Sequence, residues 1–213
     1  LTDIPLIEYV AKTNKPILMS TGMASEDEIS EALDAARSCG ARNILLFHCI
    51  SSYPAPLEQS NLNMIGTLKK KFKVEVGLSD HTLDNMAATL SISMGAVAIE
   101  KHFILDKTLT GPDSAFSMDP DQLCNLVQDT EKAWKSMGSD DFQRAKVEEA
   151  SLAFRRSIYF VKKLKEGTVI TKDHIKRIRP GYGLKPKFFD KLIGKKVISD
   201  IEIGDPVTWD IVD

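Results

Sequence analysis

Short apolar runs alternate with longer amphipathic stretches over the first 137 or so positions of the chain. The apolar runs are nearly continuous, which is typical of parallel strands that are covered on both faces. Candidate strands occupy residues 16–20, 43–49, 74–78 and 96–103. Candidate helices lie between or after them, at residues 26–39, 57–71, 82–94 and 120–137. The pattern therefore predicts repeated βα units.

The strand starts recur at roughly 25-residue intervals, which favours either a doubly wound sheet or a (β/α) barrel. No glycine-rich phosphate loop of the dinucleotide-binding type follows any of the candidate strands. Four βα units make about half of an eight-stranded barrel. An open sheet remains a possible arrangement at this point.

The pattern changes after Gly138, where a polar stretch at residues 139–144 precedes shorter, β-like segments. We expect a domain of βα units, a partial barrel, at residues 1–140, a linker at 141–152 and a small β-rich domain at 153–213. In the small domain we expect strands at residues 158–161, 193–198 and 207–209, and a helical turn at 172–176. About 60 residues is marginal for an independent core, so this domain is expected to lean on a neighbour.

Composition excludes several classes of function. The 213 residues are 43% hydrophobic and 27% charged, with a net charge of -2. This balance is ordinary for a globular protein and argues against a non-specific nucleic-acid binder. No apolar run approaches the ~20 residues that a membrane helix needs. The three cysteines are far apart and odd in number, which favours a reducing compartment, so a cytoplasmic location is expected.

Polar side chains gather where the candidate strands end. Ser20, Ser51, Tyr53, Ser79 and His81 all lie at or just after the end of one of the first three strands. In (β/α) barrels the active site is built at this edge, from the loops that follow the strands. The sequence therefore predicts a functional site at the carboxyl edge of the sheet.

His81 and His102 follow adjacent strands, so their rings are expected to converge. Imidazole is a common ligand of catalytic divalent ions, and two histidines would leave positions open for water and substrate. The alternative is a pair of hydrogen-bonded histidines that act as acid–base groups or pack. His48 lies inside an apolar strand and is expected to be a core residue or a supporting one.

Two further polar residues lie next to rigid turns. Asp113 follows Gly111-Pro112 in the long loop after the fourth strand, where it could bind a sugar hydroxyl, act as a base or close a turn. Arg179 precedes the turn at residues 180–183 in the small domain. An arginine at a loop tip can bind a substrate oxygen bidentately, although a surface role is the default.

Four motifs together resemble the sialic acid synthase family. They are GLSDHT at residues 77–82, EKHF at 100–103, GPDSAFS at 111–117 and RPGYG at 179–183, in the order that this family shows. The 21-residue interval from His81 to His102 also fits (102 − 81 = 21). The resemblance covers essentially the whole chain.

The resemblance implies a fold: the C-terminal half of a (β/α)8 TIM barrel, followed by a small antifreeze-like (SAF) domain. It also implies a domain-swapped homodimer and the condensation of phosphoenolpyruvate with an amino sugar, giving a nine-carbon 2-keto acid and phosphate. The metal ligands would be His81 and His102, with Mn²⁺ preferred to Mg²⁺ or Co²⁺. The remaining matches are Ser20, Ser51 and Ser79 around substrate, Tyr53 and Asp113 as catalytic residues near the sugar, and Arg179 offered by the partner subunit.

Within the family, the motifs resemble the pseudaminic acid branch, whose sugar substrate is 2,4-diacetamido-2,4,6-trideoxy-L-altrose. The N-acetylneuraminate and legionaminate branches are the alternatives, and a non-catalytic SAF module that binds a carbohydrate or a partner is the alternative from another class. The family barrel begins about half a barrel earlier than residue 1, with strands that supply further catalytic residues. We therefore expect the 213-residue piece to be inactive by itself.

Overall fold

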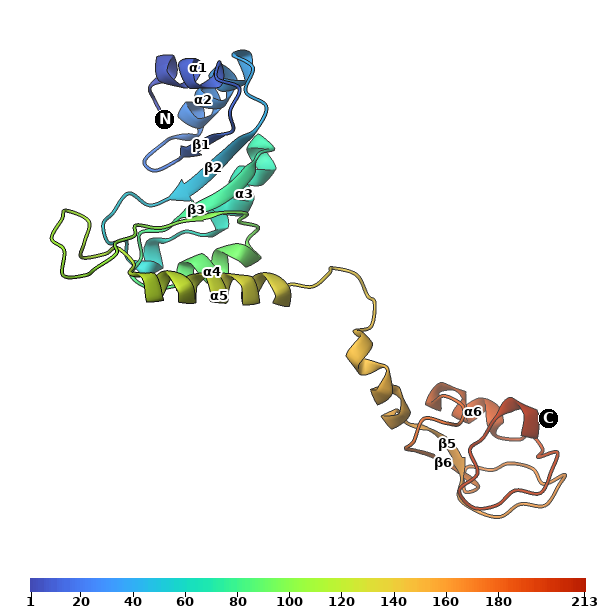
Figure 1. The fold of residues 1–213 in the computed structure, drawn as a ribbon. Coiled ribbons are helices and arrows are strands. Elements are labelled where there is room, and N and C mark those ends of the chain that lie inside the picture. The colour runs from blue at the N-terminus through green and yellow to red at the C-terminus, as the bar shows by residue number, and fades with distance from the viewer. The chain divides into compact units, whose positions relative to one another are not determined.

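The computed structural model describes residues 1–213 and divides them into two compact units, Leu1–Ser139 and Asp140–Asp213 (Figure 1). The segment expected as a linker contains most of two short 3-10 helices, η2 (Lys146–Glu148) and η3 (Ala150–Phe154), and it belongs to the second unit. No helix of the structure is both long enough and apolar enough to cross a membrane. Each unit has its own hydrophobic core.

The first unit is built on a parallel sheet of four strands in chain order. The strands are β1 (Ile17–Ser20), β2 (Ile44–Cys49), β3 (Glu75–Ser79) and β4 (Ile99–Glu100). The register brings strand ends together, since Cys49 is aligned with Ser79 and Ser79 with Glu100. The predicted α/β class with a parallel sheet is confirmed. The strand expected at residues 96–103 is shorter than expected, because ladder pairing covers only Ile99 and Glu100.

Five α-helices complete the first unit: α1 (Ile4–Ala11), α2 (Glu26–Ser38), α3 (Asn63–Phe72), α4 (Met86–Ser93) and α5 (Pro120–Ser136). Capping boxes at Ser25 and Asp119 start α2 and α5, because each side chain accepts a backbone N–H that the first turn leaves unpaired. The single helix expected at 57–71 is wrong at its start. Only the 3-10 turn η1 (Leu57–Gln59) forms there, and the left-handed φ of Asn61 (43°) separates it from α3.

The core of the first unit lies between the sheet and its helices. Ile17 and Met19 of β1 are buried in this core at 6% and 8% exposure, but Leu18 between them is 59% exposed. The expectation that both faces of every strand are covered is therefore wrong for β1, whose side chains alternate between the core and solvent. Helices α4 and α5 lie side by side below the sheet (Figure 1) and enclose a smaller cluster around Ala88, Met118 and Leu126.

The second unit is small and mostly irregular. Strands β5 (Ser157–Phe160) and β6 (Ile175–Ile178) form an antiparallel pair, accompanied by η4 (Pro186–Phe188), α6 (Phe189–Leu192) and η5 (Trp209–Ile211). The helical turn expected at residues 172–176 is wrong, because Ile175 and Lys176 pair with β5 instead. The strand expected at 193–198 contributes only isolated bridges, although Val197 lies in the core.

Candidate functional site

The carboxyl edge of the sheet gathers the polar ends of three neighbouring strands. Ser79 at the end of β3 donates a hydrogen bond of 2.8 Å from Oγ to Oε1 of Glu100 at the end of β4. Cys49 at the end of β2 is aligned with Ser79 in the register. Because parallel strands end at the same edge, the residues that follow these three also emerge close together.

Four rings meet at this edge. Tyr53 lies with its ring centroid 4.4 Å from that of His81, 5.8 Å from that of His102 and 5.6 Å from that of Phe116. The centroids of the two histidine rings are 5.3 Å apart, and Phe116 meets His102 edge-on at 4.9 Å. The structure therefore brings together the two histidines and the tyrosine that the sequence singled out, and it adds Phe116 to them.

The orientation of His81 is fixed from two sides. Its Nδ1 lies 2.9 Å from the carbonyl oxygen of Ile50 in the loop after β2, and its own carbonyl accepts the backbone N–H of Ala55. A carbonyl only accepts, so Nδ1 must be the protonated nitrogen of the neutral ring. The ring is buried, at 8% exposure, and the other nitrogen, Nε2, has no hydrogen-bond partner within the protein.

His102 faces Asp113, which is on the loop that follows β4. Nδ1 of His102 lies 3.4 Å from Oδ2 of Asp113, and the two side chains are 32% and 55% exposed. The backbone carbonyl of Asp113 closes the turn by accepting from Oγ and N of Ser117. Asp113 therefore closes the turn through its backbone carbonyl, while its carboxylate faces His102.

The two imidazoles suit a divalent ion. A metal-bound histidine almost always donates its second ring N–H to a carbonyl or a carboxylate. His81 makes such a hydrogen bond to the carbonyl of Ile50, and Nδ1 of His102 faces the carboxylate of Asp113 at 3.4 Å. No group of three or more His, Cys, Asp or Glu side chains could hold an ion by itself. Two neutral nitrogen ligands would therefore leave several coordination positions for water and substrate.

The loops after β1 and β2 approach each other closely at the same edge. A Cβ added at Gly22 would collide with the side chains of Cys49 and Ser51, so only glycine fits there. Burial raises the pKa of the Cys49 thiol, and the nearby charge of Glu100 adds to this, although hydrogen bonds from Gly22 and Ser51 oppose it. Ser20 at the end of β1 and Ser51 are both solvent-exposed.

The residues that precede the two histidines in the chain, Asp80 and Lys101, form a buried ion pair. Nζ of Lys101 is 3.0 Å from Oδ2 of Asp80, and the two side chains are only 4% and 2% exposed. The same ammonium donates to the carbonyl oxygens of Thr82 (2.6 Å) and Asp84 (3.3 Å). Neither the burial nor the pairing of these two charged residues can be read from their spacing in the sequence.

Arg179 is exposed and belongs to the second unit, whereas the residues described so far belong to the first unit. His48 has the supporting role expected of it, since its Nε2 lies 2.8 Å from the carbonyl oxygen of Ser60 and it is 5% exposed. Burial lowers the pKa of His48 below its usual 6.5, against a smaller opposite effect of the Ser60 hydrogen bond.

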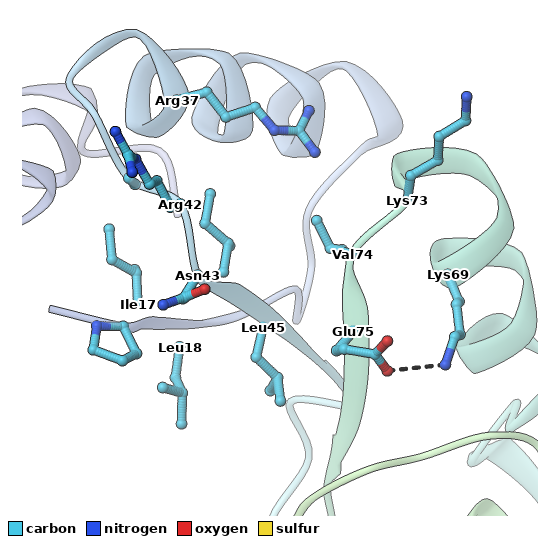
Figure 2. Close-up of a pocket in the computed structure, with 13 residues that line it drawn as sticks. Ile17, Leu18, Arg37, Arg42, Asn43, Leu45, Lys69, Lys73, Val74 and Glu75 are labelled. Atoms are coloured by element: carbon cyan, nitrogen blue, oxygen red, sulfur yellow. Dashed lines mark hydrogen bonds and ion pairs between the residues drawn. The ribbon is translucent and has the colours of Figure 1, made fainter. Parts of the chain in front are cut away.

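The opposite, amino edge of the sheet carries a pocket of about 620 Å³ (Figure 2). Arg37, Arg42, Lys69 and Lys73 surround it, and Lys69 pairs with Glu75 at 2.9 Å. Figure 2 shows Leu18 and Leu45 on the side of the strands away from Arg37. None of the side chains that line this pocket is a buried polar group. Buried His81 and the buried ion pair of the first unit lie at the carboxyl edge instead.

Comparisons with curated proteins connect these features to relatives. The chain is 42% identical over 211 residues to an uncharacterized protein, MJ1065, of Methanocaldococcus jannaschii, covering 99% of this chain and 63% of that protein. It is 37% identical to a pseudaminic acid synthase of Campylobacter jejuni, covering 95% and 59%. The chain thus spans about 60% of the length of these relatives.

Solved structures of similar proteins resemble this chain in fold as well as in sequence. The spore coat polysaccharide biosynthesis protein SpsE of Bacillus subtilis is 32% identical, with a TM-score of 0.62 over 100% of this chain and 65% of that one. The N-acetylneuraminic acid (sialic acid) synthetase of Leptospira borgpetersenii, solved in complex with citrate, is 34% identical with a TM-score of 0.66, over 70% and 52%.

Two family matches divide the chain. A SAF domain matches residues 155–212, and the NeuB family matches residues 1–142, two thirds of the 213 positions. The family expected from the four sequence motifs is thereby confirmed, and so is the expected pairing of a barrel-type α/β region with a SAF domain. The chain belongs to the NeuB family.

Proposed function

We propose that this chain supplies the metal-binding part of an active site that condenses phosphoenolpyruvate with an amino sugar. The observation that carries the proposal is the pair of histidine rings at the carboxyl edge, with Nδ1 of His81 hydrogen-bonded to Ile50 and Nδ1 of His102 facing the Asp113 carboxylate at 3.4 Å. Membership of the NeuB family supports it, since several relatives are named as synthases of nonulosonic acids.

In this reaction the C3 carbon of phosphoenolpyruvate attacks the sugar aldehyde, water adds at C2, and phosphate leaves with C–O cleavage. A bound divalent ion, with Mn²⁺ proposed ahead of Mg²⁺ or Co²⁺, would polarise the aldehyde oxygen as a Lewis acid. His81 and His102 would hold that ion through Nε2. The work of the protein is then mostly positioning and electrostatic stabilisation.

The other residues of the edge have proposed roles that follow from their contacts. The Asp113 carboxylate faces Nδ1 of His102, so it would favour a proton on that nitrogen, and it is half-exposed and can also accept a sugar hydroxyl. Tyr53 is 54% exposed beside both histidines, so its hydroxyl is available to substrate. Exposed Ser20 and Ser51, together with Ser79 next to Glu100, would bind the substrates.

The sugar proposed is 2,4-diacetamido-2,4,6-trideoxy-L-altrose, the substrate of the pseudaminic acid branch. It is supported by the motifs and by relatives named pseudaminic acid synthase at 36% to 37% identity, while two legionaminic acid synthases at 34% and 36% form the alternative. Phosphate release should be measured with phosphoenolpyruvate, Mn²⁺ and each candidate sugar in parallel, using the intact protein. Faster turnover of an N-acetylmannosamine-type or legionaminate-type precursor would reject the altrose assignment.

Arg179 is proposed to act from a partner subunit in a domain-swapped homodimer. The support is its exposed position in a separate unit that matches the SAF domain. Mixing an Arg179→Ala protein with a His81→Ala protein should restore part of the activity, because one site in a mixed dimer would then contain both residues. Absence of any recovery, with mixed dimers demonstrated by mass, would contradict the swap.

A further inference from the structure

The ion pair of Asp80 and Lys101 has an unusually complete set of hydrogen bonds. An ammonium has three hydrogens, and Lys101 directs them to three oxygens, those of Asp80, Thr82 and Asp84. The second carboxylate oxygen of Asp80 accepts the backbone N–H of Thr82 at 2.9 Å. Both charges are therefore buried and fully paired.

The residues of this network are the sequence neighbours of the two histidines. His81 lies between Asp80 and Thr82, and both of these neighbours are bonded to Lys101. Lys101 itself directly precedes His102. The backbone N–H of Asp80 also donates to the carbonyl of Glu100 at 2.9 Å. One buried ammonium thus ties the segment that holds the first ring to the segment that holds the second.

Stability alone is a weak reason for such a pair. Burying two charges carries a large desolvation penalty, and an apolar pair of similar volume often stabilises a protein equally well. A salt bridge with four defined hydrogen bonds fixes geometry more narrowly than apolar contacts, which permit sliding. The salt bridge joins the two segments that carry His81 and His102, whose ring centroids are 5.3 Å apart, so it can fix that separation.

We propose that Asp80 and Lys101 are positioning residues that set the distance and direction of the His81 and His102 rings, and through them the affinity for a divalent ion. The inference deepens the proposed function and rests on it. It assigns neither residue a contact with substrate. Its direct consequence is that disrupting the pair weakens metal binding even in a protein that remains folded.

The test is Mn²⁺ titration of the intact protein, with free Mn²⁺ followed by electron paramagnetic resonance. Lys101→Met and Asp80→Asn should each weaken the affinity roughly tenfold or more, the range seen when partners of metal ligands are removed. Lys69→Met and Glu75→Gln are the matched controls, because they break an ion pair of similar length (2.9 Å) at the other end of β3. The controls should bind Mn²⁺ as the wild type does.

A double variant separates positioning from folding. Asp80→Leu combined with Lys101→Met leaves no unpaired buried charge, so it should fold even where Lys101→Met does not, yet it should still bind Mn²⁺ weakly. Unchanged Mn²⁺ affinity in this folded double variant would overturn the proposal.

Histidine imidazole nitrogen resonances, recorded without metal, supply the second readout. They should shift or broaden for both rings in the double variant and stay unchanged in Lys69→Met. Unmoved resonances in the double variant would equally overturn the proposal. If the wild type itself binds no Mn²⁺, the proposed function fails, while these resonances still decide whether the pair positions the rings.

Discussion

The two edges of the parallel sheet each contain a lysine–carboxylate pair of nearly the same length in very different surroundings. At the amino edge, Lys69 and Glu75 are 2.9 Å apart with side chains 45% and 56% exposed. At the carboxyl edge, Lys101 and Asp80 are 3.0 Å apart with side chains 4% and 2% exposed. Distance therefore does not distinguish the pairs, and burial does.

The difference in burial shows where the molecule tolerates the desolvation penalty of a buried ion pair. Water already solvates an exposed pair, so breaking it changes little. Removal of one partner from a buried pair leaves a charge without compensation, which is strongly unfavourable. The costly pair lies next to the two histidines, and the exposed pair lies at the rim of the amino-edge pocket shown in Figure 2.

The largest expected effect of a substitution is on turnover at the carboxyl edge. His81→Ala or His102→Ala in the intact protein should lower phosphate release by a factor of about 100 to 1,000 or more, because several kcal/mol of charge stabilisation would be lost with the ion. Arg42→Gln, at the amino edge, is the control and should leave turnover unchanged. Wild-type rates in both histidine variants would contradict the proposed site.

The next largest effect should be on stability. Lys101→Met is expected to lower the free energy of unfolding by about 3–5 kcal/mol. Lys69→Met should lower it by no more than about 1 kcal/mol. Urea unfolding followed by far-ultraviolet circular dichroism measures both, since most of the helix lies in the first unit. Equal losses in the two variants would mean that burial does not separate the two pairs.

Metal affinity should respond to the carboxylate beside His102. Asp113→Asn is expected to weaken Mn²⁺ binding by roughly 10- to 100-fold, since it removes the charge that faces Nδ1 of His102. Asp106→Asn removes a charge from the same loop, where the Asp106 carboxylate is bonded only to Thr108, and should have little effect. Similar losses in both variants would indicate a general effect of loop charge instead.

The smallest expected effect is on the pH dependence of stability. Because burial lowers the pKa of His48 below 6.5, the unfolded chain binds its proton at a higher pH than the folded one. The contribution of neutral His48 is therefore complete above pH 6.5 and is lost as the pH falls towards the folded pKa. His48→Gln, which can still donate to Ser60, should flatten the fall in unfolding free energy between about pH 7.5 and 5.5. A slope identical to that of the wild type would exclude His48 as its source.

The sequence by itself determined the class of the first unit and the placing of its polar edge. Apolar runs and the caps at Ser25 and Asp119 locate strands and helices because burial and unpaired N–H groups are local requirements. Spacing along the chain also placed His81 and His102 after adjacent strands. The four motifs together also indicated the family, which the match over residues 1–142 confirms.

Only the tertiary structure decided what those residues touch. Phe116 meets His102 across 14 positions (116 − 102 = 14), and Lys101 reaches Asp80 across 21 positions (101 − 80 = 21). Strand pairing also differs from what the local sequence pattern predicts. Strand β6 forms where a helical turn was expected, and β4 contains only two residues. Burial, hydrogen-bond partners and ring separations depend on how distant segments pack, and sequence spacing does not contain them.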